Sequence, residues 1–292
     1  VFWLLNSGCA STIVERTLAP EPGQRSVDIR RGFRYSGQHA HLMHAPLTRE
    51  LLQLVPKTCL HRGRLFNATL WRVNRDGEWV VKDISACPWP YRWTFGRLAV
   101  RHEYRVVHRL QGLAGVPRDP FRIDGCAWGY RYIDGGILHL LDSARCGRPF
   151  FLKLEQVARG VHARGIVHLD LRNARNVLVD AQDNPHIIDF QASLFTRRLP
   201  GAIRRYLERL DLSGVYKHWL IRDGATLDTA RGRILLWQLR LRHWWPFRGY
   251  RLPGRRALYQ EEVAFLQRCR RERERRRGGG APDAPAAPEN QA

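Results

Sequence analysis

Polar residues between positions 165 and 190 are the strongest candidates for chemistry in this chain. The stretch GIVHLDLRNARNVLVDAQDNPHIIDF sets Asp170, Asn176 and Asp189 beside short runs of Val, Ile and Leu. We expect these runs to be short strands packed on a preceding helix, which leaves the three polar side chains at strand ends and loop edges, facing a cleft. Two carboxylates and an amide make an oxygen-rich site that suits Mg²⁺. The second carboxylate could accept a proton from an attacking hydroxyl group.

The sequence upstream predicts two strands followed by a helix. The stretch ATLWRVNRDGEWVVKD has two strand-like runs joined at Asp76-Gly77, and this favours a β-hairpin because a tight primed turn needs positive φ. A helix that carries Glu103 should follow and stop near Gly112. Its apolar positions at helical spacing are Leu98, Val106, Leu110 and Leu113.

A second strand-to-helix unit is expected before the polar stretch. The sequence AWGYRYIDGG predicts a buried strand that runs into a glycine-rich hinge. The following FFLKLEQVARGVHARG predicts a helix that ends before Gly165. One face of this helix is apolar and consists of Phe150, Leu154, Val157 and Val161. The pattern of strands first and helices later indicates an α+β fold.

The combination of HLDLRNARN and a later IDF resembles the catalytic loop and the metal-binding segment of protein-kinase-like phosphotransferases, which read H-R-D-L-x-x-x-N and D-F-G. The resemblance implies that Asp170 is the catalytic base and that Asn176 and Asp189 hold Mg²⁺. It also implies supporting roles, with His168 orienting the loop and Phe190 packing beneath the metal site.

The resemblance extends to the N-terminal side. The stretch EWVVK resembles the strand with the phosphate-binding lysine, here Lys82, and Glu103 resembles its ion-pair partner. Composition supports Lys82 independently, because the chain has 45 Arg and only four Lys, so a lysine on this strand points to a need for a compact ammonium group. In HRGRLFNATLW, Gly63 and Asn67 stand where a glycine-rich loop would cover the nucleotide phosphates.

Several departures from the motifs of regulated kinases indicate which members of the superfamily the chain resembles most. Asn176 follows Asp170 by six residues instead of five, Gln191 replaces the final glycine of D-F-G, and neither an A-P-E segment nor a long activation loop follows. These features favour compact bacterial relatives, namely RIO-like serine/threonine kinases and lipopolysaccharide core (Kdo/heptose) kinases. The resemblance implies a two-lobed fold, with a small antiparallel β lobe and one key helix in residues 43–132 and a mainly helical lobe in residues 133–268.

The expected activity is ATP- and Mg²⁺-dependent transfer of the γ-phosphoryl group to a hydroxyl acceptor. A protein Ser/Thr is the first candidate acceptor, through the RIO-like resemblance, and a lipopolysaccharide core sugar at the inner membrane face is the alternative. A catalytically weak pseudokinase, or a basic binding scaffold, is the alternative of another class. This alternative stays open because the stretch in place of the glycine-rich loop has Gly63 as its only glycine, and because the catalytic loop has an extra residue.

The net charge of +22 predicts anionic partners. Residues 231–277 contain 15 Arg against four Glu, although arginines on solvated helix faces would give the same count. Aromatic residues interleave with Arg between Trp237 and Tyr250, which is typical of contact with an anionic membrane surface and equally of core packing. No nucleic-acid-binding motif accompanies them, so nucleic acid is the less favoured partner.

The two ends of the chain are predicted to lie outside the folded part. Residues 1–42 are poorly patterned and precede Met43, the only methionine, so we expect a flexible extension or a mis-assigned start. Residues 269–292 pass from basic to Gly/Pro/Ala-rich and predict a disordered tail. No apolar run reaches the roughly 18 residues of a membrane span, and the six cysteines form no C-x-x-C pair. A cytoplasmic protein is expected, with peripheral contact with the inner membrane as the alternative.

Overall fold

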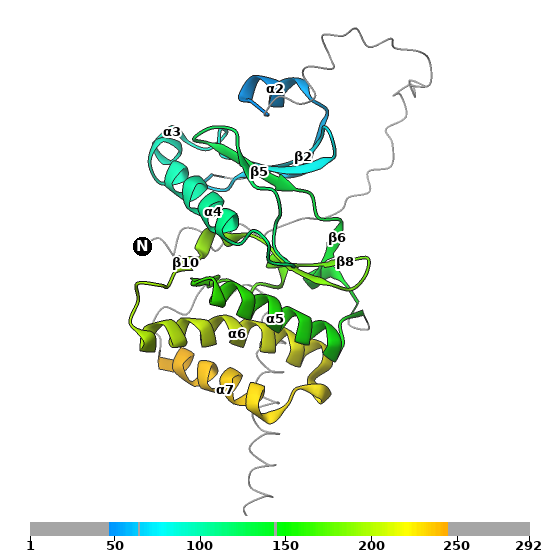
Figure 1. Cartoon of the computed structure of the whole chain (residues 1–292), viewed down its shortest axis with the longest axis vertical. Coiled ribbons are helices and arrows are strands. Elements are labelled where there is room, and N and C mark those ends of the chain that lie inside the picture. The colour runs from blue at the N-terminus through cyan, green and yellow to red at the C-terminus, as the bar shows by residue number, and fades with distance from the viewer. Residues whose placement is uncertain (1–46, 64, 143–144, 245–292) are drawn as a thin grey trace, which may run out of the picture.

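The computed structural model describes residues 47–63, 65–142 and 145–244, and its architecture is α+β. An antiparallel sheet with helix α4 forms one part, and helices α5, α6 and α7 with small strand pairings form the other (Figure 1). This arrangement is compatible with a two-lobed fold. The expected extension at 1–42, the tail at 269–292 and the basic aromatic stretch beyond residue 244 lie outside the described residues.

Five strands form the main sheet in the order β1-β2-β3-β5-β4, and each neighbouring pair is antiparallel. The predicted hairpin is confirmed, with Asp76 at a φ of 48° and Gly77 at a φ of 111° between β2 and β3. The strands are β1 (Lys57–His61), β2 (Thr69–Asn74), β3 (Glu78–Asp83), β4 (Phe121–Arg122) and β5 (Ala127–Arg131).

Side chains of β3 alternate between the two faces of the sheet. Val81 belongs to a small cluster beneath α2 (Arg49–Leu54), and Asp83 accepts a hydrogen bond from Arg49 at 2.6 Å. Val80 belongs to the main core on the opposite face, so Lys82, two residues further, points toward α4. The alternation therefore directs a lysine into the interior of the molecule, where it is 7% exposed.

The predicted helix around Glu103 is confirmed as the end of a continuous helical run. This run consists of α3 (Trp89–Tyr91), the π-helical turn η1 (Arg92–Gly96) and α4 (Arg97–Arg109). Val106 and Leu110 are buried as their spacing predicts, but Leu98 is 59% exposed. The placement of Leu98 on the buried face is wrong because the buried side of α4 includes Val100, and a residue two positions away on a helix points to nearly the opposite side.

Three stacked helices dominate the second part of the chain (Figure 1). They are α5 (Arg148–Ala163), α6 (Gly201–Asp223) and α7 (Thr229–Trp244). Two small antiparallel pairings lie between them and the main sheet: β6 (Gly135–Ile137), β8 (Val177–Asp180) and β9 (Pro185–Ile187) in one, and β7 (Ile166–Val167) with β10 (Leu194–Phe195) in the other. The second part of the chain also contains short 3₁₀ turns, which are η2 (Leu138–Leu140), η4 (Ala174–Asn176), η5 (Phe190–Ala192) and η6 (Gly224–Thr226).

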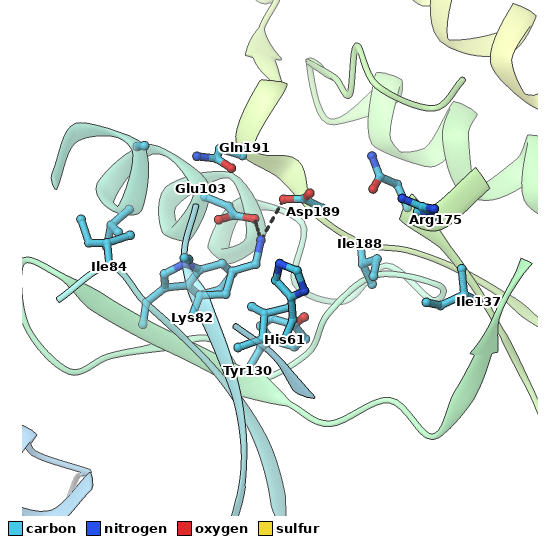
Figure 2. A pocket seen from close by; sticks show the side chains of 16 residues that line it. His61, Lys82, Ile84, Glu103, Tyr130, Ile137, Arg175, Ile188, Asp189 and Gln191 are labelled. Atoms are coloured by element: carbon cyan, nitrogen blue, oxygen red, sulfur yellow. Dashed lines mark hydrogen bonds and ion pairs between the residues drawn. The ribbon is translucent and has the colours of Figure 1, made fainter. Parts of the chain in front are cut away.

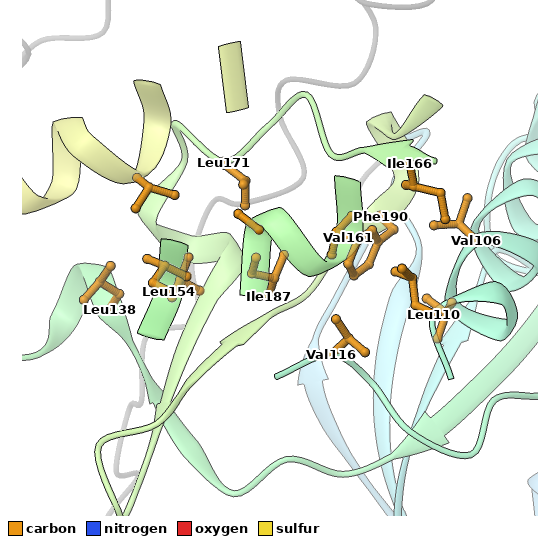
Figure 3. Close-up of a cluster of buried hydrophobic side chains, with 14 of the residues drawn as sticks. Val106, Leu110, Val116, Leu138, Leu154, Val161, Ile166, Leu171, Ile187 and Phe190 are labelled. Carbon is orange, nitrogen blue, oxygen red and sulfur yellow. The ribbon is translucent and has the colours of Figure 1, made fainter. Parts of the chain in front are cut away.

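One hydrophobic core joins the two parts. Val106 of α4 and Leu110, the residue after α4, lie close to Val161 of α5 and to Phe190 in Figure 3, and all four side chains are buried. The predicted apolar face of α5 is confirmed for Phe150, Leu154 and Val161, whereas Val157 is only partly buried. The sheet and the helices therefore share the main apolar core, which packs the two parts against each other.

The core also contains a histidine that must stay neutral. His218 of α6 is 5% exposed, and its Nε2–H donates to the Leu171 carbonyl at 3.0 Å. Burial, reinforced by the charge of Lys217, lowers the pKa of His218 from 6.5 to about 3. The folded state thus binds fewer protons than the unfolded state between these two values, and its stability is lost as the pH falls below 6.5.

We therefore predict that the free energy of unfolding decreases below pH 6.5, with His218 contributing up to about 1.4 kcal/mol per pH unit. His218→Gln keeps a donor for the Leu171 carbonyl but cannot take up the proton. Urea unfolding at several pH values from 7 down to 4 measures the free energy of unfolding. We expect this free energy to fall less steeply with decreasing pH in the variant than in wild type. Identical slopes for the two proteins would contradict the assignment.

Candidate active site

The ammonium group of Lys82 lies at the centre of the candidate site. Its Nζ donates to Glu103 Oε1 at 2.5 Å and to Asp189 Oδ1 at 2.9 Å. The three residues come from β3, from α4 and from the segment after β9, and Figure 2 shows their side chains meeting at the ammonium group. The structure thus brings together three residues that the sequence places more than 80 positions apart from first to last.

Burial gives the two carboxylates different properties. The side chains of Lys82 and Glu103 are 9% and 6% exposed, and that of Asp189 is 20% exposed. Burial raises the pKa of Glu103, against the opposing charge of Lys82. Burial also disfavours the charged form of Asp189, but the charge and hydrogen bond of Lys82 outweigh it, so the pKa of Asp189 lies below its usual value. The lowered pKa keeps Asp189 ionised, so its carboxylate can hold a cation.

A cleft between the sheet and the second part of the chain contains this centre. Lys82, Glu103, Asn176 and Asp189 line its polar end. Its apolar wall includes Leu70, Val100, Trp128, Tyr130, Ile137 and Ile188. A cleft of this kind suits a ligand that has a flat apolar portion and an anionic portion, because apolar walls bury the first and a few convergent polar groups orient the second.

Asp170 and Asn176 are in direct contact despite the extra residue between them. The Asn176 amide nitrogen donates to Asp170 Oδ2 at 2.8 Å and to the Asp170 carbonyl at 3.1 Å. The 3₁₀ turn η4, capped by the Asn173 side chain, takes up the additional residue and turns Asn176 back toward Asp170. Because the amide nitrogen is used in this contact, the amide oxygen is the atom of Asn176 that could bind a cation in the cleft.

Burial raises the pKa of Asp170, and repulsion from the nearby Asp189 carboxylate adds to this effect. A raised pKa increases the basicity of a carboxylate, which favours acceptance of a proton. Asp170 contacts Asn176, which lines the cleft, so a proton donor bound at the cleft mouth would lie close to it.

A buried aspartate on α6 holds the backbone before Asp170. Asp211 is 2% exposed and accepts the His168 N–H at 2.6 Å and the Leu169 N–H at 2.7 Å. The ring of His168 is bonded to the Ile188 carbonyl through Nε2 at 3.0 Å. The loop is thus bonded both to α6 and to the strand end that leads to Asp189.

Phe190 packs in the core next to the histidine of the loop. The side chain is fully buried, and its ring centroid lies 4.8 Å from that of His168. Asp189 itself adopts a left-handed backbone conformation with a φ of 65°. Asp189 therefore turns toward Lys82 while the next side chain packs into the core.

Two predicted cofactor-binding residues do not line the cleft. Gly63 and Asn67 face each other across the β1–β2 connection, where a Cβ on Gly63 would lie 2.0 Å from the Asn67 carbonyl oxygen. That carbonyl also accepts a hydrogen bond from the Cys87 thiol at 3.4 Å. His61 at the end of β1 and Ala68 in the connection line the cleft instead. Gly63 serves to let the two sides of the loop meet closely.

Sequence reasoning missed two basic residues of the cleft, His61 and Arg175. The guanidinium of Arg175 makes no hydrogen bond or ion pair with the residues that the structure describes. The spacing of the motif could have identified Arg175 as a cleft residue, because Arg175 occupies the fifth position after Asp170, where the kinase motif has its asparagine. Gln191, which stands in place of the D-F-G glycine, lines the cleft as well.

The side chains present fit a cation that is shared with a ligand. Within the described ranges, no three His, Cys, Asp or Glu side chains are grouped to hold a metal ion by themselves. Mg²⁺ usually keeps several waters and binds one or two carboxylates plus substrate phosphates. Asp189 and the Asn176 amide oxygen, both on the cleft wall, match this smaller set of protein ligands. Separately, each helix in the described ranges is too short or too polar to cross a membrane.

We predict that Asp211→Ala lowers the free energy of unfolding by about 4 kcal/mol, because two backbone N–H groups lose their acceptor in a buried place. Asp211→Asn, which keeps one acceptor oxygen, should lose about half as much. Glu208→Ala on the same helix is the matched control, since its pair with Arg204 is partly exposed and about 0.5 kcal/mol is expected. Urea unfolding measures all three. Equal losses at positions 211 and 208 would refute the anchoring role.

Comparison with known proteins assigns no family. No family model matches the chain, and no curated protein matches it in sequence. The contacts within the cleft are therefore the basis for inferring its function.

Proposed function

We propose that the chain is an ATP- and Mg²⁺-dependent kinase with a protein-kinase-like fold, which transfers the γ-phosphoryl group to a hydroxyl acceptor. The buried contact of Lys82 with both Glu103 and Asp189 is the observation on which the proposal rests. This contact combines an ammonium group for phosphate, a carboxylate that positions it and a second carboxylate for a metal ion. The antiparallel sheet with α4 and the helices that follow are consistent with two lobes around a nucleotide.

The residues in and beside the cleft would have different roles in phosphoryl transfer. Lys82 would bind phosphate oxygens, held in place by Glu103. Asp189 and Asn176 would hold Mg²⁺, which supplies neutralisation of the phosphate charge. Asp170 would accept the proton of the acceptor hydroxyl and orient it in line with the γ-phosphoryl group. Phosphoryl transfer needs mainly positioning and electrostatic stabilisation, and a rigid set of charged groups provides both.

The apolar wall of the cleft supports a purine nucleotide. Leu70 from the sheet and Ile137 and Ile188 from the second part contribute to the same wall. A flat aromatic base could lie between apolar side chains that come from two sides, and its phosphates would then point toward Lys82.

A protein Ser/Thr hydroxyl is the first candidate acceptor. A lipopolysaccharide core sugar at the inner membrane face is the second, and the cationic side chain of Arg175 in the cleft favours it because such a sugar carries carboxylate or phosphate groups. Phosphate analysis of lipopolysaccharide, alongside phosphoproteomics, separates the two. The comparison needs deletion cells complemented with either wild type or Asp170→Asn, and the acceptor is the species whose phosphate is restored by wild type alone.

We predict that Asp170→Asn reduces phosphoryl transfer by about 10² to 10⁴-fold, because the amide cannot accept the proton. Mg-ATP binding should change little, since Asp170 lies outside the set of side chains that line the cleft. Calorimetry measures binding, and release or transfer of the γ-phosphoryl group measures turnover. Asp183→Asn in an exposed turn is the matched control and should retain full activity.

Wild-type protein that binds Mg-ATP but transfers phosphate to no protein, sugar or lipid acceptor would instead establish the pseudokinase alternative. A variant as active as wild type would remove Asp170 from the proposed mechanism.

A further inference from the structure

Four large apolar side chains are exposed at the beginning of the helical run that carries Glu103. Trp89 is 71% exposed, Trp93 is 57% exposed, Phe95 is 52% exposed and Leu98 is 59% exposed. They belong to α3, η1 and the first turn of α4, which protrude at the outer end of the run in Figure 1, far from α5 and α6. We name these four residues the apolar tip.

Packing of the helical run does not depend on the apolar tip. Val100 and Val106 of α4 are buried in the main core and fix the helix against the rest of the molecule. Tyr91 packs near the tip, with its ring centroid 5.1 Å from that of Phe66. Single exposed apolar residues are common on protein surfaces, but a concentration of them within ten residues indicates a contact surface.

The surroundings of the apolar tip are strongly basic. Residues 84–102 and 190–200 together contain five Arg and neither Asp nor Glu. Arg101 and Arg105 follow Leu98 at helical spacing, and both are exposed. The Arg97 guanidinium lies over the Trp93 ring, 3.8 Å from its centroid. Arg101 and Arg105 form no ion pair within the part of the chain that the structure describes.

A second exposed segment continues this surface toward the candidate active site. Phe195 of β10 has its ring centroid 5.7 Å from that of His102 on α4. Leu194 and Phe195 are 40% and 38% exposed, and the exposed Arg197 and Arg198 follow them. Since β10 begins five residues after Asp189, a partner on this surface would lie at the edge of the cleft.

We propose that the apolar tip and the adjoining β10 segment bind the surface of an anionic lipid bilayer. Indole rings and guanidinium groups are the side chains that settle at the headgroup level, where the ring reaches the acyl boundary and the cation meets lipid phosphate. The elements that carry the tip protrude in Figure 1, so its exposed side chains can enter a deformable interface, and the arginines around it supply attraction to anionic lipid. This proposal is independent of the proposed kinase activity.

Co-sedimentation of the full chain with vesicles tests the proposal. Vesicles of phosphatidylcholine with phosphatidylglycerol should bind the protein and pure phosphatidylcholine vesicles should bind it much more weakly, with added salt reducing the difference. Trp89→Ser/Trp93→Ser should weaken binding about tenfold. Leu140→Ser is the matched control, because Leu140 is 63% exposed but lies in η2, outside the tip, and its binding should equal that of wild type.

A conservative variant locates the contact directly. Trp89→Phe/Trp93→Phe keeps apolar rings at the tip, so it should still bind. Brominated phosphatidylcholine in the mixed vesicles should quench the tryptophan fluorescence of wild type and quench the variant far less. Far-UV circular dichroism and thermal unfolding verify that all variants are folded.

Three results would overturn the proposal. One is failure of wild type to bind the mixed vesicles. Another is undiminished binding of folded Trp89→Ser/Trp93→Ser, which would assign attachment to a different part of the chain. The third is concentration-dependent self-association of wild type that the same substitutions abolish without any effect on vesicle binding, which would identify a second copy of the chain as the occupant.

Discussion

Burial of a single ammonium group constrains how the sheet, helix α4 and the second part of the described structure are arranged. A charge removed from water is tolerated only beside compensating charges and hydrogen-bond partners. For Lys82 these are Glu103 on α4 and Asp189 beyond β9, so the sheet, the helix and the second part must all meet at one point. The shared core that contains Val106 and Phe190 holds them there. The cleft is a consequence of this meeting, which explains why its polar end is charged and its wall apolar.

A second set of contacts fixes the loop that carries Asp170 and Asn176. Asp211 on α6 accepts hydrogen bonds from two successive backbone N–H groups of this loop. His218, also on α6, donates a hydrogen bond to the carbonyl of the residue after Asp170. The buried side chains of α6 therefore hold the loop through hydrogen bonds to its backbone atoms. The side chains of Asp170 and Asn176 remain available to each other and to a ligand, which is the pre-organisation that the proposed phosphoryl transfer would require.

Local features of this fold were predictable from sequence, because turn chemistry and periodicity act over a few residues. The hairpin at Asp76-Gly77 and the helix with Glu103 are examples. The exposure of Leu98 was not predictable, since spacing alone does not tell which face of a helix turns inward. The place of Arg175 in the cleft was missed for another reason: it depends on how η4 absorbs an extra loop residue, which only the three-dimensional path of the loop shows.

Calorimetric titration of ATP, in Mg²⁺ and again in excess chelator, tests the central claim most directly when wild type is compared with Asp189→Asn. If Lys82, Glu103 and Asp189 form a Mg-nucleotide site, wild type binds ATP much more tightly with Mg²⁺ than without it. In Asp189→Asn this advantage should shrink by about tenfold or more, because the charged metal ligand is lost. Equal affinity with and without Mg²⁺ in wild type, or an unchanged Mg²⁺ dependence in the variant, would contradict the account.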